Sequence, residues 1–152
     1  MKKLLAVTLV LSLFFGITGV INAAEIKSHT DPTLCMGVKH TVSEGANVQL
    51  YDCSDTDVHK NWSITPWDRS ICQTGGSIIY CIDFREGAVD AIVTQKAGWK
   101  NNQRWLYDGG DLKFHNNNYG LCLDTEDQSP NSQVKVTNCE GWKQYQEWEI
   151  HY

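Results

Sequence analysis

The chain has 152 residues, of which 13 are basic and 18 are acidic, so its formal net charge is −5. An acidic surface repels phosphate groups, which argues against nucleic acid or an anionic membrane as a partner. The length suits one globular domain, and the charge places no restriction on neutral ligands such as glycans.

The N-terminal segment predicts export from the cell. Lys2 and Lys3 precede an apolar run over residues 4–13, and the segment ends at the small residues Ala23 and Ala24. This pattern is typical of a cleaved secretory signal peptide. An uncleaved anchor is the alternative, but the stretch falls short of the about 18–20 residues that usually span a bilayer. We expect residues 1–23 to be the signal peptide, and 24–152 to be a secreted, periplasmic or extracellular domain without membrane insertion.

Short alternating segments rich in β-branched and aromatic residues follow the signal peptide at 48–51, 91–94 and 134–137. Such segments are typical of β-strands. Gly, Asn, Asp and Pro clusters that favour turns lie between them, at 75–76, 108–110, 116–118 and 129–131. No segment of the mature chain has convincing helical periodicity. The sequence therefore predicts an all-β domain.

A threefold repeat organises these segments. Trp62, Trp105 and Trp148 are spaced 43 and 43 residues apart, and we number the units that they mark one, two and three. Units of this size cannot bury their own apolar faces and must share one core. A propeller typically needs four or more blades, so three units favour a β-trefoil. We expect the three tryptophans, which recur at one position of every unit, to lie in that core.

All cysteines follow the signal peptide: Cys35, Cys53, Cys72, Cys81, Cys122 and Cys139. An even count in an exported chain predicts disulfides, although the count alone leaves their pairing open. A zinc site is the alternative. It fits poorly, because the chain has no C-x-x-C motif and its histidines do not cluster with the cysteines at ligand spacing. We expect neither a metal nor a cofactor.

Two recurring motifs carry a resemblance to a known family. Residues 103–105 (QRW) and 146–148 (QEW) look like the Q-x-W signature of ricin-B-type (R-type) lectins, and residues 81–83 (CID) and 122–124 (CLD) look like their C-L-D motif. The resemblance covers residues 26–152. It implies a β-trefoil with a six-stranded barrel capped by three hairpins.

The resemblance also implies disulfides inside the repeats, which suggests Cys35–Cys53 and Cys122–Cys139. Unit two departs from the pattern, because Lys96 occupies the position of the second cysteine. Cys72 and Cys81 then remain to pair with each other across a hairpin.

In the family that this chain resembles, the aspartate of the C-L-D motif accepts hydrogen bonds from sugar hydroxyls, supported by the glutamine of Q-x-W. A carboxylate suits two adjacent hydroxyl donors. The matching residues are Asp83, Asn102 and Gln103 in unit two, and Asp124 and Gln146 in unit three. We expect unit two to be the better site, because its polar set is more complete. The alternative is that each aspartate only ties its own loop to the glutamine.

The stacking aromatic ring of these lectins is missing from units two and three, where Thr94 and Thr137 stand in its place. Both units carry a tryptophan three residues beyond the second cysteine position, Trp99 and Trp142, and unit one does not. We expect these two tryptophans to replace the missing rings. The alternative is that they pack against adjacent loops as small satellite cores.

Unit one keeps its aromatic ring, Tyr51, but Gly37 replaces its aspartate, so we expect it to be a dead site. No sound catalytic constellation is present, and we expect no enzymatic activity. The sequence favours a secreted lectin that binds galactose-like or related glycans. The alternative is a cell-binding or protein-interaction subunit of a larger, toxin-like assembly, in which a protein is the partner.

Overall fold

The computed structural model describes residues 23–85, 89–98 and 100–152. Within these residues the chain forms strands and two single-turn 3-10 helices, in agreement with the predicted all-β class. In chain order the elements are β1 (Ala23–Ser28), β2 (Leu34–Lys39), β3 (Ala46–Asn47), β4 (Gln49–Asp52), β5 (Val58–His59), β6 (Asn61–Thr65), β7 (Ser70–Gly75), β8 (Ile78–Phe84), β9 (Ala91–Gln95), η1 (Asn101–Gln103), β10 (Leu106–Asp108), β11 (Lys113–Asn116), β12 (Leu121–Thr125), β13 (Val134–Asn138), η2 (Gln144–Gln146) and β14 (Trp148–His151).

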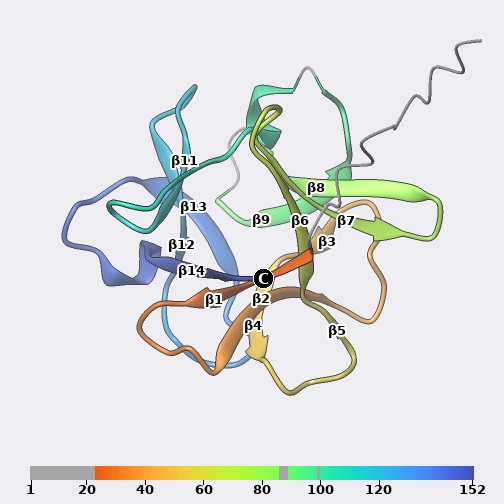
Figure 1. Cartoon of the computed structure of the whole chain (residues 1–152), viewed down its shortest axis with the longest axis horizontal. Helices are drawn as coiled ribbons and strands as arrows, with labels where there is room; N and C mark the ends of the chain where they lie inside the picture. Colours follow the sequence, from red (N-terminus) through yellow and green to blue (C-terminus); the bar gives the residue numbers. More distant parts are fainter. Residues whose placement is uncertain (1–22, 86–88, 99) are drawn as a thin grey trace, which may run out of the picture.

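These strands form three equivalent units, which Figure 1 shows as three lobes around a common centre. Unit one contributes β1, β2, β4 and β6, unit two β7–β10, and unit three β11–β14. The first and fourth strands of each unit build the barrel, in which β1 pairs with both β6 and β14 and so joins the two ends of the chain. The middle strands form the capping hairpins β2–β4, β8–β9 and β12–β13. The predicted β-trefoil is confirmed.

The three repeated tryptophans lie in the shared core, as predicted. Trp62, Trp105 and Trp148 are 0%, 2% and 1% exposed. Each indole Nε1 donates a hydrogen bond to a backbone carbonyl of its own unit, to Met36 at 2.8 Å, Ile82 at 3.0 Å and Leu123 at 3.2 Å. A buried indole N–H needs such a partner, and the threefold scaffold supplies an equivalent one in each unit.

Each unit is closed by one disulfide, and all three predicted pairs are confirmed. Cys35–Cys53 and Cys122–Cys139 link β2 and β12 to the segments that follow β4 and β13, over 18 and 17 residues. Cys72–Cys81 instead joins the neighbouring strands β7 and β8, over 9 residues. Three disulfides indicate an oxidising compartment.

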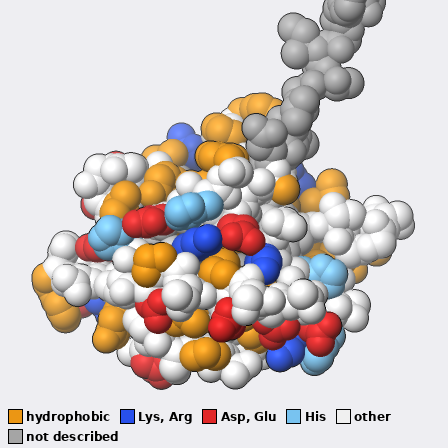
Figure 2. All heavy atoms as spheres, turned by 60° about the horizontal axis from the view of Figure 1, so that its bottom comes forward, with side chains coloured by type: hydrophobic (Ala, Val, Ile, Leu, Met, Phe, Trp, Pro, Cys, Tyr) orange, Lys and Arg blue, Asp and Glu red, His pale blue; other side chains and the backbone are white. Residues whose placement is uncertain are grey.

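The surface mixes charges of both signs. On the face shown in Figure 2, acidic, basic and histidine side chains are interspersed with hydrophobic ones. No helix of the described part of the chain is long and apolar enough to cross a membrane. The signal peptide falls almost wholly outside the described residues and stays a prediction, with its cleavage point after the first residue of β1.

Candidate functional site

The polar residues expected in unit two meet where β8 ends. Asp83 is 2% exposed, and the single turn η1 brings Asn102 and Gln103 to its carboxylate. Gln103 Nε2 donates to Asp83 Oδ2 at 3.1 Å, and Asn102 Nδ2 donates to Oδ1. Gln103 also accepts the backbone N–H of Ala97 at 2.9 Å and so holds the following loop. The predicted grouping of these three residues is therefore present.

Thr94 adds a contact that the sequence did not predict. Its hydroxyl donates to Asp83 Oδ2 at 2.5 Å and accepts from Gln103 Nε2 at 2.7 Å. At the position of the missing aromatic ring, the threonine therefore supplies a third hydrogen-bond donor to the carboxylate. Both oxygens of Asp83 therefore have protein partners, as expected if the aspartate only holds its own loop against the glutamine. Trp99, the expected ring of this unit, lies outside the described residues.

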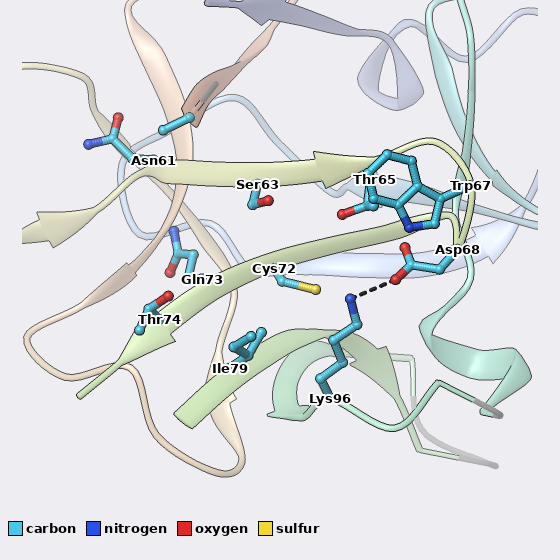
Figure 3. A pocket seen from close by; sticks show the side chains of 11 residues that line it. Asn61, Ser63, Thr65, Trp67, Asp68, Cys72, Gln73, Thr74, Ile79 and Lys96 are labelled. Carbon is cyan, nitrogen blue, oxygen red and sulfur yellow. Dashed lines mark hydrogen bonds and ion pairs between the residues drawn. The ribbon is translucent and has the colours of Figure 1, made fainter. Parts of the chain in front are cut away.

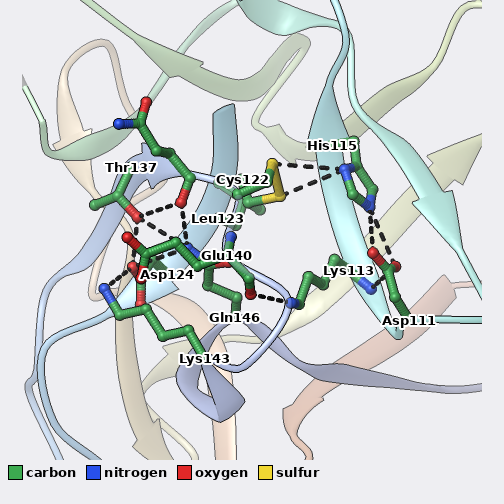
Figure 4. Close-up of a disulfide and its surroundings, with 12 residues drawn as sticks. Asp111, Lys113, His115, Cys122, Leu123, Asp124, Thr137, Glu140, Lys143 and Gln146 are labelled. Carbon is green, nitrogen blue, oxygen red and sulfur yellow. Dashed lines mark hydrogen bonds and ion pairs between the residues drawn. A yellow bond between two sulfur atoms is a disulfide. The ribbon is translucent and has the colours of Figure 1, made fainter. Parts of the chain in front are cut away.

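Unit three repeats this arrangement around Asp124, which is 1% exposed (Figure 4). Asp124 Oδ2 accepts from Thr137 Oγ1 at 2.5 Å and from Gln146 Nε2 at 3.2 Å. Gln146 Oε1 accepts the backbone N–H of Glu140 at 2.9 Å. Lys143 replaces the asparagine of unit two as the further donor, and its ammonium group forms an ion pair with Oδ2.

The two units differ at the second carboxylate oxygen. Asp124 Oδ1 is buried and has no hydrogen-bond partner among the residues that the structure describes. An unpaired buried acceptor costs about 1–3 kcal/mol, and the ion pair with Lys143 leaves this cost in place. Asp124 therefore keeps one acceptor without a partner among the described residues.

Two exposed aromatic residues flank Lys143 in the chain. Trp142 directly precedes Lys143 and is 78% exposed, and Tyr145, in η2, is 39% exposed. A tryptophan with this exposure is not packed into a satellite core, so the structure does not support that alternative for Trp142. Its ring is free to cover the apolar face of a ligand.

Unit one lacks the carboxylate for a steric reason. A Cβ added at Gly37 would clash with the side chain of Val58 and approach the carbonyl oxygen of His59 at 3.0 Å. The Tyr51 ring is buried, and its hydroxyl donates to Gln49 Oε1 at 2.7 Å. Burial and the nearby charge of Asp55 raise the pKa of Tyr51, so the phenol stays protonated. These contacts support the prediction of a dead site.

His115 lies between an aspartate and the disulfide of unit three. Its Nδ1 lies 3.4 and 3.5 Å from the two sulfurs of Cys122–Cys139, and its Nε2 lies 2.9 Å from Asp111 Oδ2 (Figure 4). A histidine and two cysteines at this spacing could hold a metal ion only if the two cysteine sulfurs were free thiolates. Here the sulfurs are bonded to each other, and His115 fills the space beside them.

Sequence reasoning missed a hollow on the outer face of β6, β7 and β8. It has a volume of about 400 Å³ and is bordered by Trp67, Asp68 and Lys96 (Figure 3). A signal was present, because Trp67 and Asp68 stand where unit three has Gly110 and Asp111.

Comparison with known proteins identifies a family to which this fold belongs. Residues 22–148 match the family described as the ricin-type β-trefoil lectin domain. A comparison with curated proteins finds no match.

Among solved structures, the designed threefold symmetric protein ThreeFoil has a TM-score of 0.68 at 22% identity, over 86% of this chain and 98% of its own. The C-terminal half of an earthworm R-type lectin, solved in complex with GalNAc, has a TM-score of 0.67 at 13% identity, over 86% and 98%. A mosquitocidal holotoxin has a TM-score of 0.65 at 15% identity over 86% of this chain, which spans 17% of the toxin's length.

At these identities the structures show the fold, while the family match covers residues 22–148. The matching family is a lectin domain and not an enzyme family. The chain belongs to the ricin-type β-trefoil lectin domain family, which supports a carbohydrate-binding module.

Proposed function

We propose that the protein is a secreted carbohydrate-binding module that recognises galactose-like or related glycans through units two and three. The observation that carries the proposal is Asp124 Oδ1, a buried carboxylate oxygen without a partner among the described residues, in a unit where the exposed Trp142 directly precedes Lys143, the ion-pair partner of Asp124. We expect unit three to be the principal site.

The chemistry of a pyranose matches these groups. Its hydroxyls donate to a carboxylate, and charged acceptors make stronger hydrogen bonds than neutral ones. Its C–H face stacks on an aromatic ring such as Trp142. Lys143 covers the carboxylate in the free protein, and its side chain is 28% exposed on a flexible stem. On binding, Lys143 turns aside, a sugar hydroxyl reaches Oδ1, and the lysine ammonium donates to a neighbouring sugar oxygen.

Unit two is the second site, built on Asp83, Asn102, Gln103 and Trp99. The carboxylate of Asp83 already has protein donors on both oxygens. A sugar hydroxyl must therefore share or replace the contact of Asn102, the partly exposed member of the group. We expect weaker binding here than in unit three. Two weak sites on one rigid domain still bind a multivalent glycan surface tightly, because the second contact is intramolecular.

Galactose-type sugars are the first ligands to test, since the earthworm lectin of similar fold was solved with GalNAc. The alternative function is a cell-binding subunit of a larger assembly, and one observation favours it. The chain corresponds to a 17% share of a mosquitocidal holotoxin, where a trefoil forms part of a larger chain.

A glycan array followed by calorimetric titration with GalNAc and methyl α-D-galactoside tests the proposal. Replacing Trp142 with Ala removes the stacking face and should weaken binding about tenfold or more, the scale of losing an aromatic anchor. Trp142→Phe should restore part of the affinity. The matched control is Tyr152→Ala, which removes a ring that is 80% exposed and is not assigned to the site.

Two results would count against the proposal. If no glycan on the array binds the protein, the proposed lectin function is refuted. Capture of a specific protein by the same sample would then favour the alternative of a cell-binding subunit. Sugar binding that is unchanged in Trp142→Ala would move the principal site away from unit three.

A further inference from the structure

The hollow beside Trp67 shares none of its lining residues with the groups around Asp83 and Asp124. Its floor is the outer face of β6 and β7, formed by the small side chains of Ser63 and Thr65 and by Cys72 of the disulfide. Trp67, in the turn between these strands, stands at one end, and Asp68 and Lys96 form its side (Figure 3). Its volume of about 400 Å³ falls in the range of small-molecule sites.

The unusual disulfide of unit two creates this hollow. In unit three Cys122 bonds to Cys139, and His115 fills the space between that disulfide and Asp111. In unit two the cysteine at the position of His115 is Cys72, which takes Cys81 as its partner. The bulky imidazole is thereby replaced by a sulfur in the strand. The position of Cys139 becomes Lys96, which reaches across to Asp68.

Asp68 and Lys96 present an acceptor and a donor side by side. Lys96 Nζ lies 2.6 Å from Asp68 Oδ2 and 3.3 Å from Ser70 Oγ. Burial raises the pKa of Asp68, but the hydrogen bonds from Lys96 and Ser70 and the charge of Lys96 outweigh it, and the pKa lies below its ordinary value. These are the only charged residues among the described residues that line the hollow. The formal charges of these two side chains cancel, so together they suit a neutral ligand.

Trp67 and Gln73 add two features that favour a ligand. Trp67 borders the hollow and is 81% exposed, and unit three has Gly110 at the equivalent position. A single exposed aromatic residue is common on protein surfaces. Here, however, Gln73 borders the same hollow at 5% exposure, and its Oε1 has no hydrogen-bond partner within the described ranges. Gln73 lies at the end of the hollow opposite Trp67 (Figure 3), and the exposed ring beside Asp68 and Lys96 indicates a place for a hydroxylated ligand.

We propose that this hollow is a third sugar-binding site, which takes a neutral mono- or disaccharide. One face of the pyranose stacks on Trp67. Of two vicinal hydroxyls, one donates to Asp68 and the other accepts from Lys96. The proposal extends the proposed function to another part of the fold. It uses none of the residues assigned to the sugar sites of units two and three.

Fluorine NMR of the disulfide-bonded protein labelled with 5-fluorotryptophan separates the sites, because each of the six tryptophans gives its own resonance. Tryptophan-to-phenylalanine variants assign the resonances of Trp67 and Trp142. The probes are GalNAc and the methyl α-glycosides of galactose, glucose and mannose. We expect the Trp67 resonance to shift and saturate with at least one of them, independently of Trp142.

Asp68→Asn keeps the side-chain oxygen that caps the turn but removes the charge, so the fold is retained. It should weaken the binding seen at Trp67 about tenfold or more, as expected for the loss of an anchoring contact, and leave the Trp142 titration unchanged. Tyr152→Ala, which removes an equally exposed ring outside the hollow, should change neither titration.

The outcomes distinguish this site from the proposed function. A response of Trp142 alone would overturn the third site and leave the function intact. A response of Trp67 alone would support the third site and reject the assignment to unit three. Silence at both residues with every probe would overturn both proposals. A shift of Trp67 that depends on protein concentration without sugar would also overturn this proposal, because a second copy would then cover the hollow.

Discussion

Replacing Trp105 with alanine tests the division of the tryptophans into core and surface. The ring is 2% exposed, so the change removes almost all of its buried surface. A tryptophan buries about 200 Å², which at about 25 cal/mol per Å² corresponds to about 5 kcal/mol as an upper limit. The edge-to-face contact with Phe84, at a centroid distance of 5.9 Å, and the hydrogen bond to Ile82 are lost as well. Partial collapse of the site reduces the total, and we expect a loss of about 3–5 kcal/mol.

Urea unfolding with the disulfides intact measures this loss. Trp142→Ala is the control, because its exposed ring should contribute less than about 1 kcal/mol, like most surface residues. Trp105→Phe keeps most of the volume and leaves the Ile82 carbonyl without its donor, which should cost about 1–3 kcal/mol. If Trp105→Ala were no more destabilising than Trp142→Ala, the assignment of the repeated tryptophans to a shared core would be refuted.

Three further predictions concern the disulfides, pH and unit one. Replacing both Cys72 and Cys81 with alanine should cost about 2–3 kcal/mol in the same unfolding assay, slightly less than removing the Cys122–Cys139 disulfide, because its loop is shorter. The lowered pKa of Asp68 means that its contribution to stability is present above the ordinary aspartate pKa of about 4 and lost as pH falls through the lower, folded value; Asp68→Asn should flatten this part of a stability–pH curve, and an unchanged curve would contradict the ion pair. Tyr51→Phe should leave the calorimetric affinity for GalNAc unchanged, and any weakening would show that unit one binds sugar.

The fold could be predicted because the signals that determine it are periodic. A residue that recurs at one position of each unit occupies one equivalent environment, so the phase of Trp62, Trp105 and Trp148 identified the core. The unit-two disulfide followed from a single exception, Lys96 at a cysteine position. Both predictions depend on backbone topology, which the repeat specifies.

The details of the sites depend on side-chain conformation, which the repeat does not specify. The sequence predicted the meeting of Asp83 with Asn102 and Gln103. It did not predict that Thr94 would donate to the same carboxylate, because at this position the sequence indicates only that the aromatic ring is absent. It also gave no indication that Lys143 would cover Asp124, since a lysine in a loop can point in many directions.

The hollow beside Trp67 was missed for a related reason. The turns of units two and three share their backbone, with φ of 57° at Arg69 and 59° at Leu112. Comparison of these turns shows that a Gly-Asp pair in unit three has become Trp67-Asp68 in unit two. That difference indicates a site only when two further facts are known: the direction of the Trp67 ring, and the space that remains in unit two because Cys72 occupies the position of His115.

The threefold scaffold explains how the three units could diverge so far in their loops. Each unit contributes one buried tryptophan with a hydrogen bond to its own backbone, so the shared core does not depend on which polar groups the loops carry. Unit one can fill its aspartate position with Val58, and unit two can move its disulfide from the position of Lys96 to Cys72, without changing that core. Because stability and binding depend on different residues, substitutions at Trp67 or Trp142 should change affinity alone, and substitutions at Trp62, Trp105 or Trp148 should change the stability of the whole domain.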